Sequence, residues 1–322
     1  MSEAEAVKGL ATQQIYREEQ TMLQMVWRAF RRHKPAMVGL TIVVVFTLAA
    51  IFAPYVSPYD PEKTSLSEML NSPCIHILGC PADRPQHLMG TDELGRDLFT
   101  RILYGGRVSL SIGVMAMGLA VVVGATVGGL AGFYGGWIDN ILMRFTDMML
   151  AFPQLFILII LAIALRDLPI EALRGTAFAS VLSIVLVIAI LAWMQVARLV
   201  RASFLSLKEK EFSEAARCLG VPNWRIMLRH LMPNALSPII VAATFRVATS
   251  IITESGLSYL GFGVQPPTPT WGNMLKNAQE QMTRAPWTAI FPGLMIFVTV
   301  IAINFIGDGL RDALDPYKTE TG

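Results

Sequence analysis

Apolar and polar positions in this chain alternate in long blocks. Six apolar runs, each about the length that spans a bilayer, are separated by shorter polar stretches. None of the runs shows the period-two alternation of a barrel strand, so each one predicts a transmembrane α-helix. The chain is therefore predicted to be an all-α integral membrane protein with spans at 36–56, 108–132, 141–165, 178–200, 236–256 and 287–308.

The first run differs from a cleaved signal peptide. It follows 35 residues that include several charges, and it is longer than the roughly 7–15 apolar residues of a signal peptide. We expect it to be a membrane anchor.

Basic residues set the expected orientation. They collect before the first span and between the fourth and fifth spans, and six spans place both segments and the C-terminus on one side. The positive-inside rule makes that side the cytoplasm. The segment 57–107 then lies outside although it carries Lys63, Arg84, Arg96, Arg101 and Arg107, an exception that its length and its acidic residues tolerate.

These assignments divide the chain into five parts. The N-terminal part contains an amphipathic stretch, 15–34, which we expect to lie on the inner membrane surface. The parts are a cytoplasmic N-terminal segment (1–35), the first span (36–56), an extracytoplasmic segment (57–107), a core of five spans that includes a cytoplasmic loop at 201–235 (108–310), and a cytoplasmic tail (311–322).

Composition narrows the function. Hydrophobic residues make up 53% of the chain and charged residues 16%, compared with about 25% charged in soluble domains. The net charge is only +2, and the sequence contains no block of like charges, which argues against a nucleic-acid partner. The sequence contains no phosphate-binding G-x-x-x-x-G-K-[ST] motif, no H-E-x-x-H and no G-x-S-x-G, which argues against an ATPase or a membrane-embedded enzyme.

The polar stretch 211–234 is unusual between apolar spans. It begins with good helix formers, Gly220 suits a left-handed helix end, and Pro222 suits the start of a second helix that Pro233 is expected to limit. The pattern predicts two short helices joined by a sharp corner. Such a corner is either a rigid surface for a cytoplasmic partner or an elbow that rests on the protein's own spans.

Three features of the spans are candidates for function. Gly124, Gly128 and Gly132 share one helix face, which indicates either close helix packing or the lining of a conduit.

Arg246 lies near the middle of the fifth span, where a charge costs about 3 kcal/mol on insertion scales. Its partner is either a substrate carboxylate on a translocation path or a carboxylate or carbonyl of another helix. Glu254 lies too far around the helix to pair with it and is expected at an external gate, and Asp147 is expected in a structural ion pair.

The extracytoplasmic segment contains two of the three cysteines. Cys74 and Cys80 are six positions apart and, on an oxidising side, predict a disulfide. Free thiols are the first alternative. A zinc site formed with His76 and His87 is the second, although the spacing matches no standard site.

Several motifs resemble one transporter family. The sequence EAARCLGVPNWRIMLRHLMPN is similar to the EAA loop of binding-protein-dependent ABC importer permeases. Four further stretches resemble the dipeptide, oligopeptide and nickel subfamily, in particular its second, C-type permease: LMGTDELGRDLFTRILYGGRVSLSIG, MRFTDMMLAFPQL, ITESGLSYLGFGVQPPTPTWGNML and GDGLRDALDP.

The resemblance implies a type I ABC importer (MetI-like) permease fold with both termini cytoplasmic, in a bacterial or archaeal plasma membrane. It implies a second homologous permease subunit, two ATP-binding subunits that hold ATP and Mg²⁺, and an extracytoplasmic substrate-binding protein. This chain itself would hold no cofactor and no metal. The residues implied to couple to the ATPases are Glu211, Glu214, Ala215, Ala216 and Gly220.

The implied cargo is a di- or oligopeptide, with nickel or an oligosaccharide as alternatives on the same machinery. An ion-coupled secondary transporter is the rival class. Such a transporter is expected to carry acidic residues within several spans and no surface for an ATPase, whereas this chain has few such acids and has the 211–234 segment.

Overall fold

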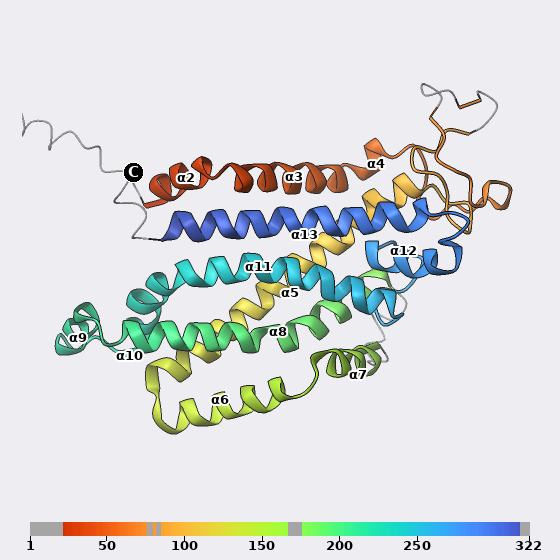
Figure 1. The fold of residues 1–322 in the computed structure, drawn as a ribbon. Helices are drawn as coiled ribbons and strands as arrows, with labels where there is room; N and C mark the ends of the chain where they lie inside the picture. Colours follow the sequence, from red (N-terminus) through yellow and green to blue (C-terminus); the bar gives the residue numbers. More distant parts are fainter. Residues whose placement is uncertain (1–21, 76–79, 82–84, 167–175, 316–322) are drawn as a thin grey trace, which may run out of the picture.

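The computed structural model describes residues 22–75, 80–81, 85–166 and 176–315. Figure 1 shows a bundle of long helices that run roughly along one axis, with α9 at one end and α12 at the other. The helices are α2 (Met22–Arg32), α3 (Lys34–Ile51), α4 (Ala53–Val56), α5 (Leu98–Tyr134), α6 (Gly136–Ala151), α7 (Gln154–Arg166), α8 (Ala177–Leu207), α9 (Glu211–Cys218), α10 (Asn223–Arg225), α11 (Met232–Tyr259), α12 (Trp271–Ala278) and α13 (Trp287–Leu314), with the short turns η1 (Leu66–Glu68), η4 (Ile226–Leu231) and η5 (Gln279–Gln281).

Five helical segments are long and apolar enough to cross a membrane: α3, α5, α8, the continuous stretch from α10 to α11, and α13. The pair α6 and α7 forms a sixth only if two helices bent by 94° count as one span. The predicted third span, 141–165, thus corresponds to a pair of helices that is broken at Phe152 and Pro153. Pro153 lacks an N–H and pushes Phe152 into an extended conformation, with φ −80° and ψ 144°, which ends α6.

Helix α5 begins at Leu98, ten residues before the predicted span at 108. Asp97 caps it, because its Oδ2 accepts a 2.7 Å hydrogen bond from the backbone N–H of Thr100. The start of the helix carries the buried Arg101. Its charge lowers the local hydropathy, so hydropathy alone placed the start of the span too late.

Helices α5 and α8 are in close contact, and α5 runs diagonally across α8 (Figure 1). A Cβ atom added to Gly124 would lie 2.6 Å from the Cβ of Val196, and one added to Gly132 would lie 2.7 Å from the Cβ of Phe204. At Gly128 the added atom would overlap the carbonyl oxygen of Ala197. The three glycines therefore serve close helix packing and do not line a conduit in this structure.

Two ion pairs connect α6 to α8. Arg201 binds Asp139 through two hydrogen bonds, of which the Nη2–Oδ2 bond measures 2.6 Å. Arg198 pairs with Asp147, as expected for a structural role of that acid. The Arg198–Asp147 pair is exposed, so outside a membrane it would contribute no more than about 1 kcal/mol.

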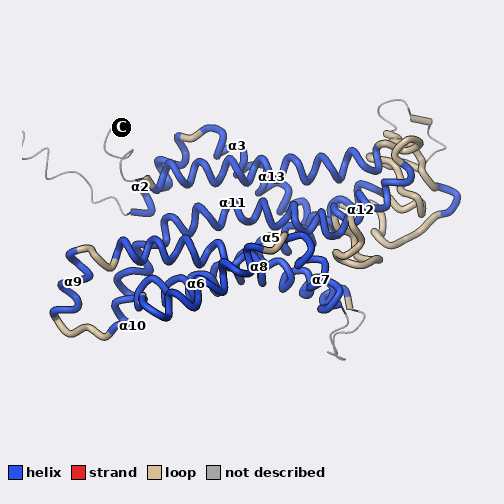
Figure 2. The backbone as a smooth tube through the Cα atoms, turned by 60° about the horizontal axis from the view of Figure 1, so that its bottom comes forward, coloured by secondary structure: helices blue, strands red, loops and turns tan. Residues whose placement is uncertain are grey.

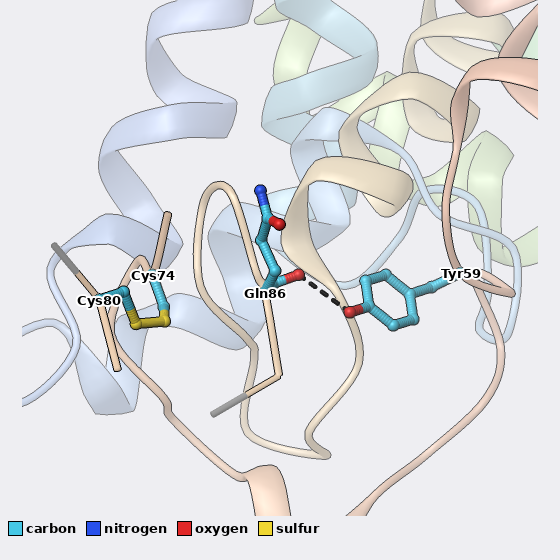
Figure 3. Close-up of a disulfide and its surroundings, with 4 residues drawn as sticks. All are labelled: Tyr59, Cys74, Cys80 and Gln86. Atoms are coloured by element: carbon cyan, nitrogen blue, oxygen red, sulfur yellow. Dashed lines mark hydrogen bonds between the residues drawn. A yellow bond between two sulfur atoms is a disulfide. The ribbon is translucent and has the colours of Figure 1, made fainter. Parts of the chain in front are cut away.

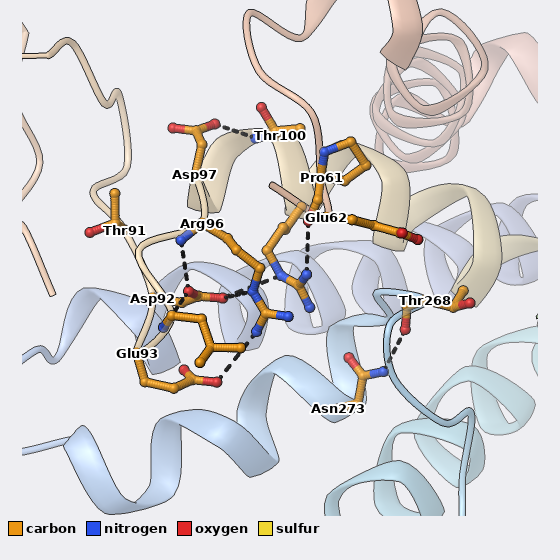
Figure 4. A network of polar contacts seen from close by, with 12 residues as sticks. Pro61, Glu62, Thr91, Asp92, Glu93, Arg96, Asp97, Thr100, Thr268 and Asn273 are labelled. Atoms are coloured by element: carbon orange, nitrogen blue, oxygen red, sulfur yellow. Dashed lines mark hydrogen bonds and ion pairs between the residues drawn. The ribbon is translucent and has the colours of Figure 1, made fainter. Parts of the chain in front are cut away.

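Buried ion pairs organise the segment before α5 (Figure 4). Arg96 Nε donates to Asp92 Oδ2 at 2.7 Å, and Arg101 Nη1 donates to the carbonyl of Pro61 at 3.0 Å. Arg96 also lies 3.4 Å from Glu93. Arg101 Nε also lies 3.5 Å from Asp92 Oδ2. Two of the bases that conflict with the positive-inside rule, Arg96 and Arg101, are therefore paired with acids of the same segment.

The same segment contains a disulfide between Cys74 and Cys80, with 5.4 Å between their Cα atoms (Figure 3). His76, part of the alternative zinc site, lies outside the described residues, and His87 Nδ1 lies 2.9 Å from Asp97. Among the residues described, no group of three or more possible ligands surrounds a metal position. The arrangement therefore favours the disulfide over a zinc site.

Tyr59 links the start of this segment to its end. Its hydroxyl donates a 2.9 Å hydrogen bond to the carbonyl of Gln86 (Figure 3), and its ring centroid lies 4.8 Å from that of His87. Burial, with the nearby carboxylates of Asp97 and Glu68, raises the pKa of Tyr59 above its ordinary value. The hydroxyl therefore stays protonated and able to donate.

The disulfide gives a simple labelling prediction. We expect a thiol reagent to modify only Cys218, which is free and exposed, in protein that has not been reduced. After reduction, intact-mass measurement should show three modified cysteines. Replacing both Cys74 and Cys80 by serine should lower the free energy of unfolding by about 2 kcal/mol or less, because the closed loop is short. Labelling of all three thiols without reduction would contradict the disulfide.

Candidate functional site

Helix α9 has two different faces. Ser213 and Ala216 are buried against the bundle, whereas Glu211, Glu214 and Ala215 are exposed. The two glutamates occupy the first turn, where negative charge interacts favourably with the helix dipole. The exposed face thus combines two carboxylates with a small residue that allows close approach.

A specific hydrogen-bond pattern fixes the corner after α9. The N–H of Gly220 donates to the carbonyl of Arg217 at 2.9 Å, and the N–H of Val221 donates to the carbonyl of Ala216 at 3.1 Å. This pair of bonds is the Schellman motif, and it requires the left-handed φ of +73° found at Gly220. The left-handed conformation predicted for this glycine is present.

The second helix of the corner does not end at Pro233, contrary to the prediction. The chain runs from α10 through η4 directly into α11. The turn η4 is a wider, π-type turn in which the N–H of Met232 donates to the carbonyl of Met227, five residues back. Pro233 then lies in the first turn of α11, where a missing N–H is tolerated.

The α9 corner (residues 211–231) rests on one face and is open on the other. Ala216, Ile226 and Leu231 pack against Val200 and Phe204 of α8 in one buried cluster. On the open face, Leu219 is 83% exposed and Trp224 is 58% exposed. The two interpretations of the segment therefore apply to opposite faces: an elbow toward the spans and an unpartnered surface away from them.

Arg246 lies at the middle of α11 and is half-buried. It makes no ion pair and no hydrogen bond with any residue that the structure describes. Thr249 and Thr253 follow at i+3 and i+7, so the three polar side chains share one face of the helix.

Glu254 occupies a different environment from Arg246. Its side chain is fully buried, and three hydroxyls hydrogen-bond to its carboxylate: Ser258 at 2.7 Å, Ser109 at 3.2 Å and Ser255 at 3.4 Å. Glu254 therefore joins α11 to α5 and does not face an opening in this structure. The sequence argument missed Ser109 because 145 positions separate it from Glu254.

Two family models match the chain. One, described as the binding-protein-dependent transport system inner membrane component, covers residues 108–319, which is more than half of the sequence. The chain belongs to this family. The other, the N-terminal TM domain of oligopeptide transport permease C, covers residues 21–73.

Individual relatives of this permease resemble nearly the whole chain. The dipeptide transport system permease protein of Alkalihalophilus pseudofirmus is 43% identical over 303 residues, 93% of this chain and 92% of the relative. The glutathione transport system permease protein of Pectobacterium atrosepticum is 41% identical over 309 residues, 95% of this chain and 96% of the relative. That of one Escherichia coli strain is 44% identical over 291 residues, 90% and 89% of the two chains.

The family establishes what kind of protein this is. The chain is an ABC importer permease of the dipeptide and glutathione group, with the all-helical MetI-like fold, and it is a multi-pass inner-membrane component. The relatives are transport permease components.

Proposed function

We propose that this permease forms half of a translocation path for a di- or oligopeptide and is driven through the α9 corner. The observation that supports the proposal is the two-sided build of α9, with Ser213 and Ala216 buried against the bundle and Glu214 exposed beside Ala215. The other half of the path belongs to a second homologous permease, and an extracytoplasmic binding protein delivers the cargo. Two ATP-binding subunits hold ATP and Mg²⁺.

The corner is suited to transmit force because it is stiff and connects two spans. Its Schellman bonds and its packing on Phe204 oppose bending. The α9 corner joins the end of α8 to the start of α11, so a displacement of α9 moves both spans together. Closure of the ATPase pair then favours one arrangement of the permeases over another through differential binding at this surface.

In this proposal, the α9 end of the bundle is the cytoplasmic end. Helix α2 lies at this end of the bundle (Figure 2), and the exposed bases Arg31 and Arg32 end α2 while the exposed Lys34 begins α3. Phe30 is buried against Ala36 and Ala313 and holds α2 on the bundle. Basic side chains at this level contact the headgroups of anionic membrane lipid.

The peptide cargo follows from the group to which the permease belongs. Its relatives carry the names dipeptide and glutathione permease, and glutathione is itself a tripeptide. Nickel and oligosaccharide, the alternatives on the same machinery, have no observation in the described residues that favours them.

The coupling role is tested on the intact complex, purified through a tag on this chain and reconstituted in lipid. With the wild type we expect two ATP-binding subunits to co-purify and ATPase activity to rise when binding protein and peptide are added. Glu214→Arg should lower this stimulated activity about 10-fold or more, because it places a charge of opposite sign in the centre of the contact. Glu280→Arg makes the same change on an exposed residue at the other end of the bundle, and should leave co-purification and basal ATPase activity unchanged.

A permease that purifies alone and transports unaided would refute the proposed function. Full stimulation in Glu214→Arg would show that α9 is not the coupling contact.

A further inference from the structure

Arg246 is a cation at membrane depth, and no carboxylate among the residues that the structure describes forms an ion pair with it. Three acids of the other helices and of α11 itself already have partners. Asp139 binds Arg201, Asp147 binds Arg198, and Glu254 is enclosed by serine hydroxyls. Asp308 follows Gly307, which packs on Phe245, yet it is exposed and makes no ion pair with Arg246. The described part of the chain therefore supplies no carboxylate to this guanidinium.

The face of α11 that carries the half-buried Arg246 also carries two threonines. Thr249 donates to the carbonyl of Phe245 at 3.1 Å, and Thr253 donates to the carbonyl of Thr249 at 2.8 Å. Both hydroxyl protons are therefore used, and Thr249 is exposed. On the face of α11 formed by Arg246, Thr249 and Thr253, the guanidinium of Arg246 is the charged hydrogen-bond donor. This face is therefore complementary to an anion.

We infer that Arg246 binds a carboxylate of the cargo while the cargo crosses the membrane. The inference rests on the proposed function and specifies the chemistry of its path. Dipeptides and glutathione share one anionic group, the carboxylate of a peptide C-terminus, and a guanidinium presents a planar pair of donors that matches a carboxylate. Because Arg246 lies at the middle of α11, it meets this group midway through the spans.

The test compares two cargoes that differ only at the carboxylate: a dipeptide with a free C-terminus and the same dipeptide with a C-terminal amide. Uptake is measured in proteoliposomes that contain the complete complex, with the binding protein saturated by each cargo. Each rate for a variant is divided by the wild-type rate for the same cargo, so the preference of the binding protein cancels.

We expect Arg246→Gln to lower uptake of the free dipeptide about 10-fold or more, as for loss of a charge-assisted hydrogen bond, and to leave uptake of the amide within about twofold. Arg246→Lys keeps the charge and should retain part of the discrimination. Arg107→Gln is the control, since Arg107 is an exposed arginine near the α12 end that donates to the carbonyl of Ile51. It should change both cargoes equally or not at all.

Two results would overturn the inference. An equal loss for both cargoes in Arg246→Gln, with the complex intact, would assign Arg246 to a counter-ion on the second permease. Loss of the co-purifying subunits in this variant would assign it to assembly. Failure of the proposed function is recognised separately, because in that case the wild type itself brings down no ATP-binding subunits.

Discussion

Gly128→Val is expected to prevent the permease from forming its folded bundle. The added Cβ would overlap the Ala197 carbonyl oxygen, which belongs to the backbone of α8 and cannot move aside by changing a rotamer. Overpacking typically costs about 1–3 kcal/mol, and this site lies at the upper end because two rigid helices would have to separate. In detergent, fluorescence-detected size exclusion should show a strong loss of the monodisperse peak and a clear fall in the midpoint of thermal unfolding.

Gly118→Val provides the matched control for this experiment. Gly118 lies on the same helix, but an added Cβ there meets no atom within 4 Å. Both substitutions change helix propensity and hydrophobicity equally, so any difference between them measures the contact with α8. Equal stability of the two variants would show that the close crossing of α5 and α8 does not hold the bundle together.

The spans that the sequence predicted well are those fixed by local information. Length and apolar composition determine α3, α8 and α13, because a bilayer requires about 20 apolar residues whatever the neighbours are. The break between α6 and α7 was also present in the sequence as Pro153, but a hydropathy argument averages over a single proline. The early start of α5 depends on contacts of Arg101 with Pro61 and Asp92, which no local pattern contains.

The candidate site divides in the same way. The corner could be predicted from Gly220, because a position with the left-handed backbone conformation strongly favours glycine. The continuation through Pro233 did not follow from sequence, since the wide turn η4 forms where Ile226 and Leu231 pack into the cluster below α9. The surroundings of Glu254 depend on Ser109 of another helix. Contacts between distant segments therefore explain both features that the sequence pattern did not contain.

Gly220→Val is expected to uncouple transport while leaving the bundle folded. A left-handed conformation costs an ordinary L-residue about 1–2 kcal/mol and a β-branched residue more. The chain can relieve this strain by giving up the bonds from Gly220 to Arg217 and from Val221 to Ala216, which releases α9 from its fixed angle. Peptide-stimulated ATPase activity and uptake should both fall at least about 10-fold if the coupling surface must be rigid to act.

Gly136→Val separates the loss of this angle from strain as such. Gly136 also has a positive φ, +58°, and like Gly220 an added Cβ there would meet no atom within 4 Å, but it begins α6 and is not part of the α9 corner. Both valines therefore introduce similar local strain in open space. We expect Gly136→Val to retain most of its stimulated ATPase activity at a comparable unfolding midpoint. If both variants lose coupling to the same degree, strain anywhere at this end of the bundle is sufficient, and the fixed angle of α9 has no special part in driving the permease.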